Sequence, residues 1–368
     1  MTAHFPTLSL AQMNAIAQVK AWLDGDTSSQ RVFRLFGCAG TDKSMLAKHI
    51  AALVDHQVIY AAFTGKAVSV MEQNGCEGAR TLHSLIYKPI SGADGRVTWR
   101  PKDSADIFDA KLIIVDEVSM IDDSLAADLL RLGLPVLALG DPAQLPPVGK
   151  HGVFASAAPD VMLEEVHRQI AGNPVLQLAT ALRAGIRPTL GAYGSSRVMM
   201  WDQLTEVELL AADQIIVGTN DTRHDFNENL RSLRGVTGDL PVNGDRIICL
   251  RNHERLGIFN GETFRVVSTP VVKKDDVTFE IVAEIGSRPA FEVTISAEQF
   301  ISGSEPMTYA RNAKPMFDFA YAITCHRAQG SQWRNVLIID QSHIAGENAH
   351  RWLYTAITRA QEQVTIVL

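Results

Sequence analysis

The stretch that most limits the fold of this chain is "RVFRLFGCAGTDKS", residues 31–44. An apolar run leads into spaced glycines, a lysine and a serine, and a helical pattern over residues 43–55 follows directly. A strand, a glycine loop and a helix in this order form a phosphate-binding loop on a parallel sheet covered by helices. The GxxxxGK[ST] signature fails at one position, because Asp42 precedes the lysine.

Other apolar runs alternate with helix-like segments, which is typical of parallel sheets covered by helices. They are residues 57–64, 110–117, 134–141, 213–220, 335–340 and 363–368. The early runs each end in a polar or charged residue, where an open α/β sheet places its ligands. The later runs form a separate series, so we expect two α/β units.

Two segments interrupt this alternation. Residues 87–105 contain Asp94-Gly95 between strand-like pieces, which predicts a β-hairpin projecting from the first unit. Residues 241–312 hold short alternating runs separated by Asn-Gly and Gly-Ser turns, which predict a small antiparallel barrel inserted in the second unit. The expected boundaries are 1–86 with 106–163 for the first unit and 164–240 with 313–368 for the second.

Composition sets modest limits on function. The net charge of −7 over 368 residues argues against a generally basic nucleic-acid coat, although a local basic groove is compatible with it. No apolar stretch is long enough to span a membrane, and the N-terminus lacks the zones of a secretory signal. We expect a cytoplasmic protein without membrane association. Its four cysteines are far apart, which favours reduced thiols over disulfides or a zinc site.

The glycine loop supplies the candidate nucleotide-binding residues. In such a loop backbone N–H groups and a helix N-terminus surround the phosphates, the lysine contacts the β- and γ-phosphates, and the serine holds Mg²⁺. Lys43 and Ser44 are the corresponding residues here. The full set of loop candidates is Gly37, Gly40, Thr41, Asp42, Lys43 and Ser44.

Two adjacent carboxylates, Asp116 and Glu117, end the buried run "IIVDE". Asp116 is suited to orient Mg²⁺, and Glu117 to polarise an attacking water. The alternative is a solvated acidic strand end, which is common for one acid but less so for a pair after an apolar run. Gln144, in "GDPAQLPPV" (140–148), lies after a third run, where an uncharged amide could sense the γ-phosphate.

With "TCHRAQGSQW" (324–333) and "YTAITRAQEQ" (354–363), the ordered motifs resemble superfamily 1 helicases of the RecD and Dda type across nearly the whole chain. The resemblance implies two RecA-like domains, a hairpin pin that splits the duplex, and an SH3-like barrel that closes over the strand. It implies an ATP-dependent DNA helicase that uses ATP and Mg²⁺ and moves 5′ to 3′. The implied partners are single-stranded DNA, single-strand/double-strand junctions and replication, repair or recombination proteins, and we expect a monomer.

The resemblance also assigns residues around the nucleotide. Gln12 in "LSLAQMNAI" (8–16) would recognise adenine; the alternative is a polar face of an amphipathic helix. Arg168 and Arg359 would reach the ATP from the second unit and stabilise charge on the transferred phosphoryl group. Gly330 and Gln332, together with Gln329, would couple the nucleic-acid contact to the nucleotide.

A further set of residues is implied to contact nucleic acid. It consists of Thr64, Lys66, Thr81, His83, Asn220, Asn260, Thr324 and His326. Phosphate contacts of this kind position a strand but carry no sequence information. Trp99, near the hairpin, could stack on a base, or it could be a core or hairpin-stabilising side chain.

Asp42 conflicts with the remainder of the site. The backbone at this position passes close to the phosphates, so a side chain crowds them. A carboxylate at about 4 Å, with an effective dielectric near 20, adds repulsion on the order of 4 kcal/mol, which corresponds to roughly three powers of ten in affinity. We therefore expect impaired ATP binding. The alternatives are a helicase that tolerates Asp42 and an ATPase-deficient nucleic-acid-binding or regulatory factor; a nucleotide kinase or GTPase is disfavoured by the second unit and by "YTAITRA".

Overall fold

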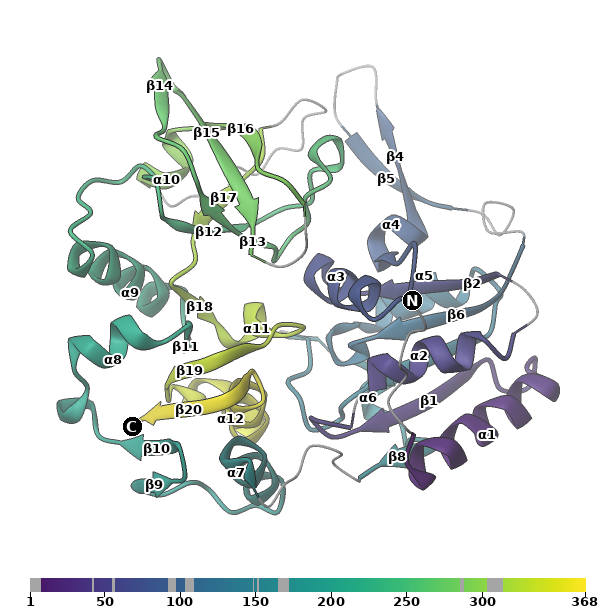
Figure 1. Ribbon diagram of the computed structural model, residues 1–368. Coiled ribbons are helices and arrows are strands. Elements are labelled where there is room, and N and C mark those ends of the chain that lie inside the picture. Colours follow the sequence, from purple (N-terminus) through teal and green to yellow (C-terminus); the bar gives the residue numbers. More distant parts are fainter. Residues whose placement is uncertain are drawn as a thin grey trace, which may run out of the picture.

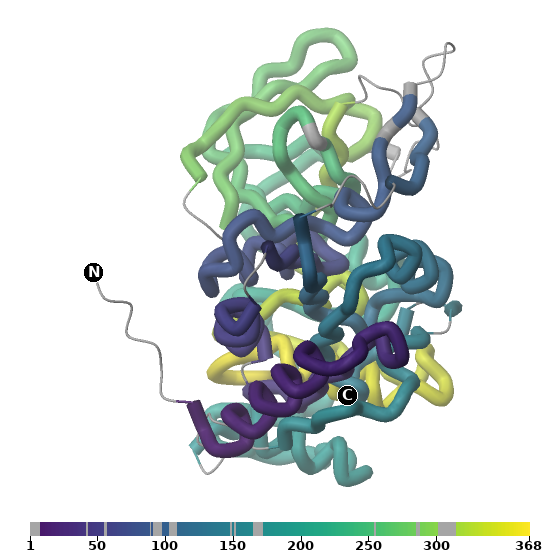
Figure 2. Tube along the Cα trace, turned by 90° about the vertical axis from the view of Figure 1, so that its right-hand side faces the viewer, coloured from purple at the N-terminus to yellow at the C-terminus, as the bar shows by residue number. Residues whose placement is uncertain are grey.

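The computed structural model describes residues 8–41, 43–54, 57–91, 97–102, 109–147, 149–150, 152–164, 172–284, 288–302 and 314–368. Two α/β units lie side by side, with a small β-sheet beside the second and a two-stranded hairpin projecting from the first (Figure 1). Seen from the side, the small sheet and the hairpin occupy the same end of the molecule (Figure 2).

The first unit is built on a six-stranded sheet of order β3-β2-β6-β7-β1-β8, and all its paired neighbours are parallel. Its strands are β1 (Val32–Gly37), β2 (Gln57–Ala62), β3 (Arg80–Thr81), β6 (Ala110–Asp116), β7 (Val136–Gly140) and β8 (Val161–Leu163). The central strands read as apolar runs because helices cover both faces of the sheet. Along β6, Leu112 and Ile114 pack into one core while Ile113 and Val115 pack into the other.

Helices of the first unit divide between these two faces. One face is covered by α1 (Leu10–Asp24), α2 (Lys43–Ala51) and α3 (Gly65–Gln73). The other is covered by α4 (Leu82–Ile86), α5 (Asp123–Leu130), α6 (Val153–Ser156) and the short η2 (Val118–Met120).

The predicted hairpin strands are present as β4 (Tyr87–Ser91) and β5 (Val97–Pro101), which pair antiparallel. The Tyr87 hydroxyl donates to the Asp128 carboxylate on α5, which ties the base of the hairpin to the first unit. The Trp99 side chain is 45% exposed, so the core alternative for this residue is wrong. The role of the hairpin as a pin stays a prediction.

The second unit has a sheet of order β18-β11-β19-β20-β10-β9, parallel except for the edge strand β9. The strands are β9 (Gly191–Tyr193), β10 (Ser196–Met199), β11 (Gln214–Val217), β18 (Ala322–Thr324), β19 (Trp333–Ile339) and β20 (Ala360–Val367). The strands β9 and β10 were not predicted, because these short strands carry no long apolar run.

Helices again cover both faces of the second sheet. One core involves α7 (Pro174–Arg183), α11 (Cys325–Ala328) and α12 (Ala349–Ile357). The other involves α8 (Glu206–Ala211) and α9 (Asn220–Leu233), and η4 (Trp201–Gln203) and η6 (Ser342–Asn348) are short connecting turns. Among the described residues, no helix combines the length and the apolar character needed to cross a bilayer.

The small sheet has the order β14-β15-β13-β12-β17, with β16 on the other edge of β15. Its elements are β12 (Arg246–Cys249), β13 (Thr263–Val266), β14 (Val271–Lys273), β15 (Asp276–Ala283), β16 (Phe291–Ser296), β17 (Phe317–Phe319), η5 (Glu254–Leu256) and α10 (Glu298–Ser302). Its strands pair antiparallel around a separate core.

One boundary of this insertion needs correction. We placed residues 313–368 in the second unit, but β17 pairs with β12 of the small sheet. The ladders within the described ranges do not close into a ring, and the SH3-like barrel stays a prediction. At one edge Phe300 of α10 packs on Phe319 of β17 with ring centroids 4.9 Å apart, so a helix covers the edge strand.

Candidate nucleotide and nucleic-acid site

The loop between β1 and α2 has the backbone that its glycines predict. A Cβ atom at Gly37 would lie 2.5 Å from Thr41 Oγ1, so this approach is available only to glycine, and Gly40 has a φ of +83°. Thr41 Oγ1 donates to the Cys38 carbonyl over 2.9 Å. Lys43 Nζ donates to the carbonyls of Gly37 (2.7 Å) and Cys38 (3.0 Å), so the ammonium lies over the loop.

Two of the predicted site residues, Asp42 and Arg168, lie outside the described residues. The repulsion expected from Asp42 and the contact expected from Arg168 therefore stay predictions.

The two predicted magnesium ligands, Ser44 and Asp116, come together from α2 and the end of β6. Ser44 Oγ donates to Asp116 Oδ2, and the Glu117 N–H donates to Asp116 Oδ1 over 2.8 Å. Glu117 has the left-handed backbone φ of +54°, a conformation that non-glycine residues adopt mainly at turns and functional sites. Burial raises the pKa of Glu117, the Arg359 charge opposes this, and Asp116 reinforces it.

The loop after β7 carries Gln144. Its backbone is fixed by Asp141, whose Oδ1 accepts from the Ala143 N–H (3.0 Å) and whose carbonyl accepts from the Gln144 N–H (3.1 Å). The Gln144 side chain is buried, and its Oε1 has no hydrogen-bond partner among the described residues. Buried polar groups are normally paired, so this amide has capacity to bind a water or ligand.

Side chains of the second unit hold the same two loops. The Tyr354 hydroxyl, on α12, donates to Asp141 Oδ2 (2.6 Å) and accepts from the Ala39 N–H of the phosphate loop (3.2 Å). Thr355 Oγ1 accepts from the Leu145 N–H over 2.9 Å. The sequence analysis included "YTAITRA" but missed both residues, because nothing in the motif shows which of its side chains face the first unit.

Two more contacts join the second unit to these loops of the first unit. Gln329 Nε2 donates to the Leu145 carbonyl over 3.0 Å, so Gln329 contacts the loop that carries Gln144. Arg183, at the end of α7, contacts Cys38 Sγ in the phosphate loop. Burial raises the pKa of the Cys38 thiol, and Arg183 opposes the shift. Arg183 had no predicted role.

Arg359 is held within the second unit. Its Nε donates to the Thr355 carbonyl (3.0 Å) and its Nη1 to the Ser331 carbonyl (3.2 Å). The guanidinium is buried, and its positive charge lowers the pKa of Glu117 against the effect of burial. In this structure the predicted phosphate contact would therefore require Arg359 to leave these carbonyls.

Gln12 lies at the start of α1 and is buried, so the solvated polar face that we considered for it is wrong. Its amide forms a capping box with Ser9: the Ser9 N–H donates to Gln12 Oε1 (3.0 Å), and the Gln12 N–H donates to Ser9 Oγ (3.2 Å). Gln12 Nε2 donates to the Thr41 carbonyl over 3.3 Å. This bond joins α1 to the phosphate loop, while adenine recognition stays a prediction.

Several predicted nucleic-acid residues lie where the units meet. Thr64 begins α3, and its Oγ1 accepts from the Ala67 N–H over 3.2 Å. Gly330 has a φ of +73°, and a Cβ atom there would lie 3.0 Å from Thr64 Oγ1, so Gly330 lies against Thr64. The coupling to the nucleotide that was predicted for Gly330 stays a prediction. Asn260 follows Phe259, which packs so closely on Gly65 that a Cβ atom at Gly65 would lie 2.1 Å from Phe259 Cβ.

Other members of that set lie on separate edges. Thr81 ends β3 and caps the N-terminus of α4. His83 is exposed on α4, with its ring 5.9 Å from that of Tyr87 at the base of the hairpin. Asn220 begins α9 shortly after β11, and Thr324 is the last residue of the neighbouring parallel strand β18, so both lie at the same edge of the second sheet. His326 is half-buried on α11, and burial lowers its pKa.

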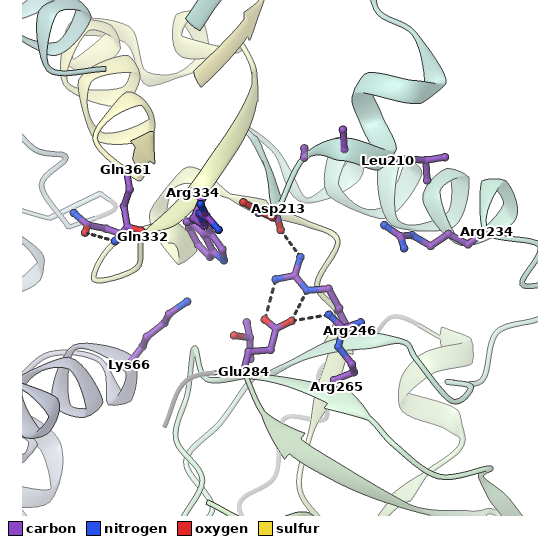
Figure 3. Close-up of a pocket in the computed structure, with 14 residues that line it drawn as sticks. Lys66, Leu210, Asp213, Arg234, Arg246, Arg265, Glu284, Gln332, Arg334 and Gln361 are labelled. Atoms are coloured by element: carbon purple, nitrogen blue, oxygen red, sulfur yellow. Dashed lines mark hydrogen bonds and ion pairs between the residues drawn. The ribbon is translucent and has the colours of Figure 1, made fainter. Parts of the chain in front are cut away.

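The side chains of Lys66 and Gln332 both contact residues of the second unit. Lys66 is only 3% exposed, and its Nζ lies 4.3 Å from the centroid of the Trp333 ring. Gln332 Oε1 accepts from Gln361 Nε2 over 3.3 Å. Both side chains line a cavity of about 470 Å³ at the junction of the two units and the small sheet (Figure 3). The nucleotide contact of Gln332 stays a prediction, and Lys66 does not lie on an open surface.

A phosphate loop, adjacent carboxylates and a second sheet whose side chains hold both loops define a two-unit P-loop nucleoside triphosphatase. A family model described as an AAA domain matches residues 10–200, and one described as a UvrD-like helicase C-terminal domain matches residues 319–367. The chain therefore belongs to the AAA-domain family. The second match extends its resemblance to superfamily 1 helicases of the RecD type.

Individual relatives agree with this assignment. The ATP-dependent RecD2 DNA helicase of Deinococcus radiodurans is 29% identical over 376 residues, which cover 91% of this chain but 47% of the relative. The ATP-dependent DNA helicase dda of Enterobacteria phage T4 is 31% identical over 165 residues, 40% of this chain and 37% of that protein. The chain thus spans about half the length of the Deinococcus relative.

Solved structures support the fold. Bacteroides Pif1 bound to single-stranded DNA superimposes with a TM-score of 0.61 at 18% identity, covering 98% of this chain and 92% of that one. A structure of two coordinating Pif1 helicases on forked duplex DNA gives a TM-score of 0.62, also at 18% identity and with the same coverage.

Proposed function

We propose that this chain is an ATP-dependent DNA helicase or translocase that moves 5′ to 3′ on single-stranded DNA and couples ATP hydrolysis to duplex unwinding. The observation that carries the proposal is the contact of Tyr354 with both Ala39 and Asp141. Because one hydroxyl of the second unit bonds the phosphate loop and the loop of Gln144, a ligand that changes either loop changes the contact between the units.

The residues present fit a magnesium nucleotide. Ser44 and Asp116 offer the hydroxyl and carboxylate oxygens that Mg²⁺ prefers, and the Gln144 Oε1 is a buried acceptor without a partner among the described residues. When bound, Mg²⁺ neutralises phosphate charge. Lys43 would exchange the loop carbonyls for phosphate oxygens. Glu117, with its raised pKa, would accept a proton from the attacking water.

The DNA partners are also proposals. Gly330 lies against Thr64, and Phe259, the neighbour of Asn260, packs on Gly65 where α3 contacts the small sheet. We place single-stranded DNA along this line. Support comes from Bacteroides Pif1, a structural neighbour solved with single-stranded DNA. The exposed Trp99 on the hairpin would meet a single-strand/double-strand junction. We further propose a monomer in the cytoplasm of a bacterial or phage-infected cell, with replication, repair or recombination proteins as partners.

We infer that Asp42 weakens ATP binding. The test is single-strand-stimulated ATP hydrolysis by the parent, Asp42→Gly and Asp42→Asn. If charge dominates, Asp42→Asn recovers most of the roughly thousandfold loss expected from one like-charge pair. If crowding dominates, only Asp42→Gly recovers activity. Equal and substantial rates in all three proteins would refute an effect of Asp42, and inactivity in all three would refute the helicase proposal.

The second candidate is a nucleic-acid-binding or regulatory factor without ATPase activity, for which the departure at Asp42 is the specific observation. It predicts that the parent binds single-stranded DNA but does not hydrolyse ATP. Lys43, Ser44, Asp116 and Glu117 are nevertheless all present. This intact set favours an active motor that one side chain restrains.

A further inference from the structure

The cavity beside Lys66 lies where three parts of the molecule meet. Lys66 enters it from α3, Trp333 and Gln361 from the second sheet, and Arg246 and Glu284 from the small sheet (Figure 3). Its volume of about 470 Å³ is within the range typical of ligand sites. No role has been given above to this cavity, and it is separate from the loops that hold the predicted nucleotide.

Most charged groups in this cavity already have partners. Arg246 donates to both oxygens of Glu284 (2.6 and 2.8 Å) and to the Asp213 carbonyl (2.6 Å). Arg334 pairs with Glu362 over 2.9 Å. Lys66 differs: among the described residues its ammonium has no hydrogen bond or ion pair, only the Trp333 ring. A buried charge without an anion is costly.

The lining as a whole favours an anion. It carries five cationic side chains and two anionic ones, in a chain whose net charge is −7. The charged residues are Lys66, Arg234, Arg246, Arg265, Arg334, Asp213 and Glu284. The Gln332 and Gln361 amides and the Thr263 hydroxyl add neutral hydrogen-bonding groups. Cationic and amide donors around a small cavity match a tetrahedral oxyanion.

We propose that this cavity is a binding site for a phosphate-bearing anion, with Lys66 as its principal charged ligand. A free phosphate or a phosphate of a single-stranded nucleic acid backbone would present the same oxyanion to it. The bound anion would supply the partner that Lys66 lacks and would join α3 to the second unit and the small sheet. The proposal does not depend on ATP hydrolysis or unwinding.

The protonation of Lys66 gives this site a distinctive pH dependence. Burial lowers the pKa of Lys66 to about 7, Glu284 opposes the shift, and Arg246 and Arg359 add to it. Because an anion binds the protonated form, affinity should be greatest below pH 7 and fall as pH rises. Between pH 6.5 and 8.5 the protonated fraction, and with it the affinity, falls about 25-fold for a pKa of about 7.

Sulfate and pyrophosphate are suitable probes for calorimetric titration. Sulfate keeps its charge over this pH range, so a change in its affinity belongs to the protein. All proteins carry Lys43→Ala, which removes the phosphate-loop lysine as a competing ligand. The test variant is Lys66→Gln, and the matched control is Lys20→Gln, which removes an exposed lysine paired with Asp24 on α1. Lys66→Arg keeps a charge at every pH and tests the pH dependence separately.

We expect Lys66→Gln to lose at least tenfold in affinity for both anions, Lys20→Gln to lose nothing, and Lys66→Arg to bind sulfate equally at pH 6.5 and 8.5. An oligothymidylate distinguishes the two sources: competition with pyrophosphate identifies a backbone phosphate, and simultaneous binding identifies a free anion. Unchanged affinity of Lys66→Gln for pyrophosphate, sulfate and the oligonucleotide would overturn the proposal. Failure of ATP hydrolysis would leave these binding results unaffected.

Discussion

Removing the Tyr354 hydroxyl should have opposite effects on stability and nucleotide binding. The hydroxyl is buried, with the residue 2% exposed, and it joins the Ala39 N–H to the Asp141 carboxylate. Burial and then the Asp141 charge raise the Tyr354 pKa well above its usual value, so the hydroxyl stays protonated throughout the neutral range. Tyr354→Phe keeps the ring and removes both hydrogen bonds.

The magnitude follows from the partners. A buried hydrogen bond to a charged acceptor contributes about 1.5–3 kcal/mol, so we expect Tyr354→Phe to lower the free energy of unfolding by about 2 kcal/mol. A bound phosphate and the Tyr354 hydroxyl would compete for the Ala39 N–H. In Tyr354→Phe the nucleotide no longer has to displace the hydroxyl, so nucleotide affinity should rise. The increase is up to about tenfold for each 1.4 kcal/mol that this displacement costs in the parent.

Urea unfolding and ADP titration, both in the Asp42→Gly background, measure the two effects. Tyr193→Phe is the matched control, because the Tyr193 hydroxyl donates to the Thr189 carbonyl (2.8 Å) within the second unit. A double-mutant cycle with Asp141→Ala isolates the contact and should give a coupling energy of about 1–3 kcal/mol. A coupling energy near zero, or weaker ADP binding by Tyr354→Phe than by Tyr193→Phe, would refute the reasoning.

Two other predictions concern neighbouring parts of the site. Gly65→Ala should cost about 1–3 kcal/mol by overpacking and weaken oligonucleotide binding, because its Cβ would lie 2.1 Å from Phe259 Cβ. Urea unfolding and anisotropy titration measure both effects. Phe259→Gly removes the clashing Cβ, and its failure to restore either quantity in the Gly65→Ala background would contradict this cause. As the pH is lowered, the rate of ATP hydrolysis by Asp42→Gly should begin to fall at a higher pH than it would if Glu117 had an ordinary pKa. The reason is that a base with a raised pKa becomes protonated at a higher pH. A pH–rate profile measures this, and an unchanged profile in a partly active Glu117→Gln variant would exclude Glu117 as its origin.

Features encoded by local pattern were predictable from the sequence. The strand, glycine loop and helix around Lys43 follow from an apolar run and two glycines, of which Gly37 leaves no room for a Cβ atom and Gly40 has a positive φ. The Asp116–Glu117 pair could be placed because parallel strands bring their carboxyl ends to one edge. The β17 strand could not be placed, because its pairing with β12 is decided by contacts between distant segments.

The contacts that individual side chains make were harder to predict from the sequence than which residues belong to the candidate site. Lys66 stands at the start of a helix, and its sequence position cannot reveal that Trp333 covers it. Gln12 has a polar side chain in an amphipathic segment, yet its amide is buried against the Thr41 carbonyl. Both contacts are made with segments that lie far away in the sequence. The hydrophobic periodicity of a helix or strand indicates which of its own residues are buried, but not which distant residues cover them.

Packing between the units also suggests how Arg359 and Gln144 act together. Thr355 bonds both sides: its carbonyl accepts from Arg359 Nε, and its Oγ1 accepts from the Leu145 N–H beside Gln144. A movement of α12 that frees Arg359 for a phosphate must therefore also alter the support of the Gln144 loop. Residues that share a partner couple energetically. Reorientation of the arginine and repositioning of the glutamine would then be one event, which the two motifs could not reveal when considered separately.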